Sequence, residues 1–153
     1  MSKILISACL MGENVRFDGK SCKKSSEILK KWQNSGRLVM LCPEVAGGLP
    51  VPRPAAEIQS DGRVITVEDG DVTAAFEQGA QKALNLCREH HIHVAILKEG
   101  SPSCGSSLIN DGNFSHTRIP GQGVTTQLLE DNGITVFSEH ELDQAEAYLR
   151  SIV

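Results

Sequence analysis

The stretch Val94-Ala95-Ile96-Leu97 is a continuous run of aliphatic residues, and it decides the fold class of this chain. Such a run is typical of a strand that is buried on both faces of a parallel sheet. A long amphipathic pattern over residues 71–90 precedes it, and the loop Ser101-Pro102-Ser103-Cys104-Gly105 comes soon after it. The run therefore predicts a central strand, at about residues 93–98, of an α/β domain.

The rest of the chain alternates strands and helices in the way that builds such a domain. Further strands are expected near residues 3–8, 37–42 and 134–137. Helices are expected near residues 25–34, 71–90 and 123–133, the second of them capped by Asp71. A last helix is expected after the capping box that begins at Ser138. The pair Asp61-Gly62 predicts a small hairpin. Short right-handed connections favour a doubly wound sheet. We expect the strand order 2-1-3-4, because it would place the ends that carry Cys42, Cys9 and the Cys104 loop side by side. We expect a single three-layer Rossmann-like α/β domain over residues 1–153, with a mainly parallel sheet of about four strands plus the small β-hairpin.

Composition narrows the class of protein. The chain has 153 residues, a formal net charge of −4 and only 4% aromatic residues, which argues against a nucleic-acid partner. No apolar stretch approaches the roughly 20 residues that cross a bilayer. Only eight residues precede Cys9, which is too few for a signal peptide. We therefore expect a cytoplasmic protein without membrane contact, in which the five cysteines stay reduced.

Three of these cysteines follow predicted strands. Cys9 follows the strand at residues 3–8, Cys42 ends the strand at residues 37–42, and Cys104 lies in the loop after the Val94-Ala95-Ile96-Leu97 run. Ligands of open α/β sheets bind at the carboxyl edge, where neighbouring parallel strands end. We therefore expect three thiols at one site, and thiolates select iron–sulfur clusters or other thiophilic metals.

Three motifs surround these cysteines. They are, in order, Ala8-Cys9-Leu10-Met11-Gly12 with Val15-Arg16-Phe17-Asp18-Gly19, Cys42-Pro43-Glu44 with Gly47-Gly48-Leu49 and Pro52-Arg53-Pro54, and Ser101-Pro102-Ser103-Cys104-Gly105. Together they resemble the DUF523 family, whose characterised members are thiouracil desulfidases, and the resemblance extends over essentially the whole chain.

The resemblance implies a [4Fe–4S] cluster held by Cys9, Cys42 and Cys104, with catalytic roles for Glu44 and Ser101. It also implies a thiolated nucleobase as the substrate, which would be converted from thiouracil to uracil with release of hydrogen sulfide. Two other functions stay open from the residues themselves. One is a non-catalytic iron–sulfur or zinc sensor, and the other is a sulfur-transfer protein that carries a persulfide on Cys104.

Several residues near these motifs have two interpretations each. Glu44 is either a catalytic base or a solvated loop carboxylate. Arg53 either clamps a substrate carbonyl or pairs with Glu57. Lys98 either balances the charge of a cluster or extends to solvent. The segment 121–126 could offer helix N-terminal amides to a base ring. Ser101 and Ser103 could simply be turn residues around Pro102.

The remaining cysteines and histidines have weaker patterns. Cys87 falls on the apolar face of the helix at 71–90 and is expected in the core. Cys22 follows a turn and is not expected to be a ligand, although it could lie near the site. The three neighbouring histidines at the end of that helix suit the helix dipole better than a metal. They are His90, His91 and His93. His116 is left without a role.

Overall fold

The fold was determined from a computed structural model that describes residues 2–152. Four strands form one sheet: β1 (Ile4–Ser7), β2 (Leu38–Leu41), β5 (Val94–Leu97) and β8 (Thr135–Ser138). Their order is β2-β1-β5-β8, and every neighbouring pair is parallel. The predicted order 2-1-3-4 is therefore confirmed, and the carboxyl ends of β2, β1 and β5 lie side by side.

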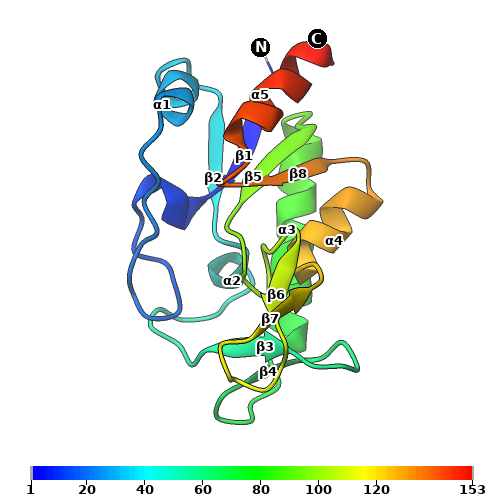
Figure 1. The fold of residues 1–153 in the computed structure, drawn as a ribbon. Helices are drawn as coiled ribbons and strands as arrows, with labels where there is room; N and C mark the ends of the chain where they lie inside the picture. Colours follow the sequence, from blue (N-terminus) through cyan, green and yellow to red (C-terminus); the bar gives the residue numbers. More distant parts are fainter. Residues whose placement is uncertain (1, 153) are drawn as a thin grey trace.

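Helices cover both faces of this sheet, as expected for three layers (Figure 1). The longer helices are α1 (Glu27–Asn34), α3 (Thr73–Glu89), α4 (Val124–Asp131) and α5 (Leu142–Ser151). Side chains of β1 alternate between two cores: Ile4 and Ile6 pack in one cluster with residues of α1 and α5, whereas Leu5 packs in the other with residues of α3 and α4. Among residues 2–152, no helix combines the length and apolar character that a bilayer crossing requires.

Short elements gather at the carboxyl edge of the sheet. They are the 3-10 helix η1 (Ala8–Met11), helix α2 (Pro43–Ala46), the strands β3 (Ala56–Ile58) and β4 (Val64–Thr66), and the strands β6 (Leu108–Asn110) and β7 (Arg118–Pro120). The hairpin of β3 and β4 matches the prediction from Asp61-Gly62. The second hairpin, of β6 and β7, was not predicted. Both hairpins lie below the sheet in Figure 1, beyond the ends of β1 and β5.

Two predicted helix caps are wrong, by one residue for α3 and by three residues for α5. Helix α3 begins at Thr73, so Val72 is its N-cap residue and Asp71 lies one position before the cap. The Asp71 carboxylate still accepts a hydrogen bond from the Thr73 N–H, at 3.0 Å. Helix α5 begins only at Leu142, because Ser138 is still paired with Leu97 in the sheet. The Glu141 carboxylate nevertheless accepts from the Ser138 N–H at 2.9 Å, which is half of the predicted capping box.

Helix α2 packs directly on α3 through two glycines. A Cβ atom on Gly79 of α3 would overlap the carbonyl oxygen of Pro43, and a Cβ on Gly47 would overlap the carbonyl oxygen of Ala75. The two backbones can approach this closely only because neither glycine carries a side chain. This contact fixes α2, and α2 carries the residues that follow Cys42.

We predict that Gly79→Ala destabilises the protein, although alanine normally favours a helix by about 1 kcal/mol over glycine. The added methyl group must push α2 away from α3, and overpacking of this kind costs about 1–3 kcal/mol. Chemical denaturation measures the free energy of unfolding, with Gln78→Ala at the exposed neighbouring position as the control. A Gly79→Ala variant as stable as the unsubstituted protein would contradict the packing described.

Candidate active site

Three cysteines from three different strand ends line one cavity at the carboxyl edge of the sheet. Cys9 lies in η1 after β1, Cys42 directly follows β2 as the N-cap of α2, and Cys104 lies in the loop after β5. The cavity has a volume of about 830 Å³ and is also lined by Glu44 and Ser101. The structure thus brings together all five residues that the sequence singled out.

The three thiols are free and sit in an environment that opposes their ionisation. Burial, with the neighbouring Cys104 as the next cause, raises the pKa of Cys9 to about 12. Burial likewise raises the pKa of Cys104 to about 12, and it raises the pKa of Cys42 above its usual value. Thiols in such a place become thiolates when a soft cation displaces their protons.

The chemistry of the three donors suits an iron–sulfur cluster, because thiolates select such clusters and other thiophilic metals. Within residues 2–152, no three His, Cys, Asp or Glu side chains lie close enough together to hold a single metal ion. Cys9, Cys42 and Cys104 are the residues that would hold a cluster, each thiolate on a different iron.

The Cys104 loop is built around the carboxylate of the half-buried Glu99. Glu99 Oε1 accepts hydrogen bonds from four backbone N–H groups, of residues 100 and 106–108, at 2.9–3.2 Å. Burial opposes ionisation of this carboxyl, but the N–H donors outweigh it and lower its pKa. The loop also packs on Gly123, where a Cβ atom would lie 2.5 Å from the carbonyl carbon of Ser103. These contacts fix the loop that presents Cys104.

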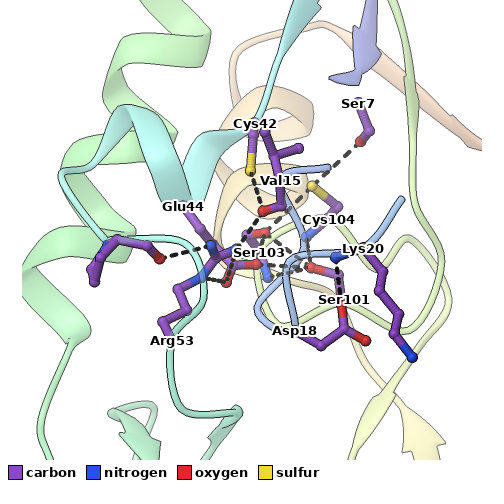
Figure 2. Close-up of polar contacts among 11 residues, drawn as sticks. Ser7, Val15, Asp18, Lys20, Cys42, Glu44, Arg53, Ser101, Ser103 and Cys104 are labelled. Carbon is purple, nitrogen blue, oxygen red and sulfur yellow. Dashed lines mark hydrogen bonds and ion pairs between the residues drawn. The ribbon is translucent and has the colours of Figure 1, made fainter. Parts of the chain in front are cut away.

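Glu44 has partners on both of its carboxylate oxygens, as Figure 2 shows. Arg53 Nε and Nη2 each lie 3.1 Å from Oε1. Ser103 Oγ donates to Oε2 at 2.9 Å, and Ser101 Oγ lies 3.4 Å from the same oxygen. Glu44 is thus held inside the site, and its interpretation as a solvated loop carboxylate is wrong.

Arg53 is the buried counterion of Glu44, and its predicted pairing with Glu57 is wrong. Its side chain is only 5% exposed, and it also donates to the carbonyl oxygens of Pro50 and Val15, at 3.1 Å each. Glu57 instead accepts from the N–H groups of residues 112 and 114. The Arg53 donors thus face protein acceptors, and the side chain joins its own loop to helix α2 and to the loop that contains Val15.

Other predicted residues lie around the same cavity. Cys22 lines it, and its N–H donates to the Cys9 carbonyl at 3.0 Å. Lys98 lines it too and forms an ion pair with Glu139 at 3.0 Å, so it does not simply extend to solvent. His116 also lies on the wall. Cys87, by contrast, is 1% exposed in the core between α3 and the sheet, as predicted.

The expectation for the segment 121–126 needs correction. Helix α4 does begin next to the site, but its first N–H groups are already in use. Those of Val124 and Thr125 donate to the carbonyl oxygens of Pro102 and Ser103 at 2.9 and 2.8 Å. The start of α4 therefore supports the Cys104 loop and has no free amides of these residues to offer to a ring.

Sequence reasoning missed two features of the site. Ser103 was considered only as a turn residue, although it contacts both Glu44 and Cys104. The hairpin of β6 and β7 contributes Asn110 and Arg118 to the cavity wall. The pair Asp111-Gly112 directly after β6 was a signal for this hairpin and was not used, because the strands have only three residues each and are seven residues apart.

The chain is similar to known proteins in both sequence and fold. A family model described as 2-thiouracil desulfurase matches residues 4–141. The chain is 40% identical over 149 residues to a Bacillus subtilis (strain 168) protein described as "Uncharacterized protein YbbK", covering 92% of this chain and 97% of that protein. It is also similar to a solved structure of the [4Fe-4S]-dependent thiouracil desulfidase TudS, with a TM-score of 0.97, 49% identity and full coverage of both chains.

The resemblance that the cysteine motifs indicated is thereby confirmed. The matched residues 4–141 run from the start of β1 to the N-cap of α5, so they include all four strands of the sheet and every site residue described above. On this evidence the chain belongs to the 2-thiouracil desulfurase (DUF523) family.

Proposed function

We propose that this chain is a [4Fe–4S]-dependent desulfidase that removes sulfur from a thiolated pyrimidine, converting thiouracil and water to uracil and hydrogen sulfide. The observation that carries the proposal is one cavity lined by the buried Cys9 and Cys104, the half-buried Cys42 and the Glu44 carboxylate. The 49% identity to a protein named as such a desulfidase supports the same reaction.

Cys9, Cys42 and Cys104 are the residues that would hold the cluster. Three cysteine ligands leave one iron without a protein ligand, and when bound such an iron supplies a Lewis acid suited to a soft thiocarbonyl sulfur. No other group of the cavity wall matches the thiols in softness except Cys22, for which a ligand role is not needed.

Glu44 is the general base of the proposed reaction. Its carboxylate accepts a proton from the water that attacks the thiolated ring carbon, and it returns a proton to the departing sulfur. Arg53 keeps the carboxylate oriented through Oε1, and the hydroxyls of Ser101 and Ser103 face Oε2. We assign the hydrogen bond to the substrate to Ser101, because Ser103 is the nearer of the two hydroxyls to Glu44. Bond cleavage of this kind requires no net oxidation or reduction.

The persulfide alternative is less well supported by the same geometry. A persulfide carrier needs an accessible thiol with a low pKa, because the thiolate is the nucleophile. Cys104 is 4% exposed, and burial raises its pKa to about 12. A thiol in this position suits metal ligation better than sulfur transfer.

Anaerobic purification followed by a sulfide assay tests the proposal. We expect a brown protein with about four irons per chain that releases sulfide from 2-thiouracil or 4-thiouracil. A colourless protein that carries zinc would contradict the cluster. A brown protein that releases no sulfide from either compound would contradict the enzyme and favour the iron–sulfur sensor.

A further inference from the structure

Ser103 stands at the centre of the polar network beside Cys104. The residue is 1% exposed, and its hydroxyl oxygen has three neighbours: Glu44 Oε2 and Ser101 Oγ at 2.9 Å each, and Cys104 Sγ at 3.4 Å. A hydroxyl carries one proton and two lone pairs. Ser103 Oγ can therefore donate to only one of these three neighbours. The hydrogen bonds around it show to which neighbour it donates and from which it accepts.

The direction of the bond between the two serines follows from the backbone around them. Ser101 Oγ accepts from the N–H groups of Ser103 and Cys104, at 3.1 and 3.2 Å. Both of its lone pairs are thus occupied, and only its proton is free. In the contact with Ser103 Oγ, Ser101 must then be the donor and Ser103 the acceptor.

The proton of Ser103 has two possible acceptors. Glu44 Oε2 lies 0.5 Å nearer than Cys104 Sγ, and a carboxylate oxygen is a far stronger acceptor than sulfur. Ser103 therefore donates to Glu44. Because Ser101 Oγ is 3.4 Å from Oε2, beyond a good hydrogen bond between oxygens, Ser103 is the hydroxyl that holds this side of the carboxylate.

We propose that Ser103 is the positioning residue of the base, holding Glu44 Oε2 opposite Arg53, and that Ser101 acts toward the substrate only as a hydrogen-bond donor. This assignment rests on the proposed function, and it divides two neighbouring serines between two roles. When a substrate occupies the cavity, the Ser101 proton turns to it, while the bond from Ser103 to Glu44 stays in place. Ser101 also anchors the backbone of the Cys104 loop, whereas the contacts of Ser103 Oγ within residues 2–152 are with the side chains of Glu44, Ser101 and Cys104.

The test is Ser103→Ala in the iron-loaded protein, compared with Ser103→Thr, which keeps the hydroxyl. We expect kcat of Ser103→Ala to fall about 100-fold, the effect of misplacing a catalytic group by about 1 Å, while KM and the iron content stay near those of the unsubstituted protein. Ser103→Thr should recover most of kcat. Ser107→Ala is the matched control, because Ser107 is an exposed serine of the same loop.

Three results would overturn the assignment: an unchanged kcat in Ser103→Ala, a loss of iron from Ser103→Ala, or a rise in KM alone. Ser101→Ala is the contrasting variant. It should raise KM, because the hydrogen bond to the substrate is lost. It should also release iron to a chelator faster, because the backbone of the Cys104 loop loses two hydrogen bonds. Failure of the proposed function is distinguishable, because then the unsubstituted iron-loaded protein would itself release no sulfide.

Discussion

Cys104→Ser is expected to bind almost no iron and to lose sulfide release. Serine has nearly the shape of cysteine, so the contacts of position 104 with Ser7 at 3.6 Å and Ser103 at 3.4 Å can be kept. What changes is the donor atom, and a hard hydroxyl oxygen is a poor ligand for a cluster that selects soft thiolates. Loss of an outer-shell partner already costs about 10–100-fold in metal affinity, so loss of a ligand costs more. Iron analysis and the visible absorption spectrum measure the effect.

The same measurement separates the three proposed ligands from the other two cysteines. Cys9→Ser and Cys42→Ser should behave like Cys104→Ser. Cys22→Ser should keep its iron even though Cys22 lines the same cavity, and Cys87→Ala should keep it because Cys87 lies in the core. Full iron content in Cys42→Ser together with iron loss in Cys22→Ser would assign the third ligand to Cys22 and contradict the proposal.

The sheet was predictable because its determinants are local in the sequence. The aliphatic run at β5 and the similar run at β1 are buried on both faces, which only a central parallel strand requires. Once these two strands are adjacent, right-handed crossovers leave few positions for β2 and β8. Within these limits the order 2-1-3-4 was chosen because it brings Cys9, Cys42 and Cys104 to one edge, and the structure has that order.

The hydrogen bonds and ion pairs of the site were less predictable, because they depend on the conformations of the loops. Arg53 and Glu57 are four residues apart, yet Arg53 bonds Glu44 because Pro50 and Val15 supply carbonyls that direct its guanidinium inward. The role of Ser103 was inferred from the distances of its hydroxyl oxygen to Glu44, Ser101 and Cys104. No pattern in the sequence indicates these distances. Similarly, the close packing of α2 on Gly79 joins segments more than thirty residues apart.

Glu44→Gln is expected to lower kcat for sulfide release by about 100-fold to 10,000-fold, the usual contribution of a general base. Glutamine keeps the size of the side chain and an oxygen that can accept from Arg53. It cannot take up a proton from water, so the chemical step should fail while the iron content stays unchanged. Steady-state sulfide release by the iron-loaded variant gives kcat, and Glu13→Gln, an exposed carboxylate in a neighbouring loop, is the control.

Glutamine is more informative here than alanine because of Arg53. The guanidinium is 5% exposed, and Glu44→Ala would leave it buried without its counterion, a change that typically costs about 3–5 kcal/mol of stability. Loss of activity in Glu44→Ala could therefore reflect a disordered site, whereas loss in a stable, iron-loaded Glu44→Gln reflects the missing proton acceptor. If Glu44→Gln keeps its iron and its kcat, the carboxylate is a structural counterion of Arg53 and the base lies elsewhere in the cavity.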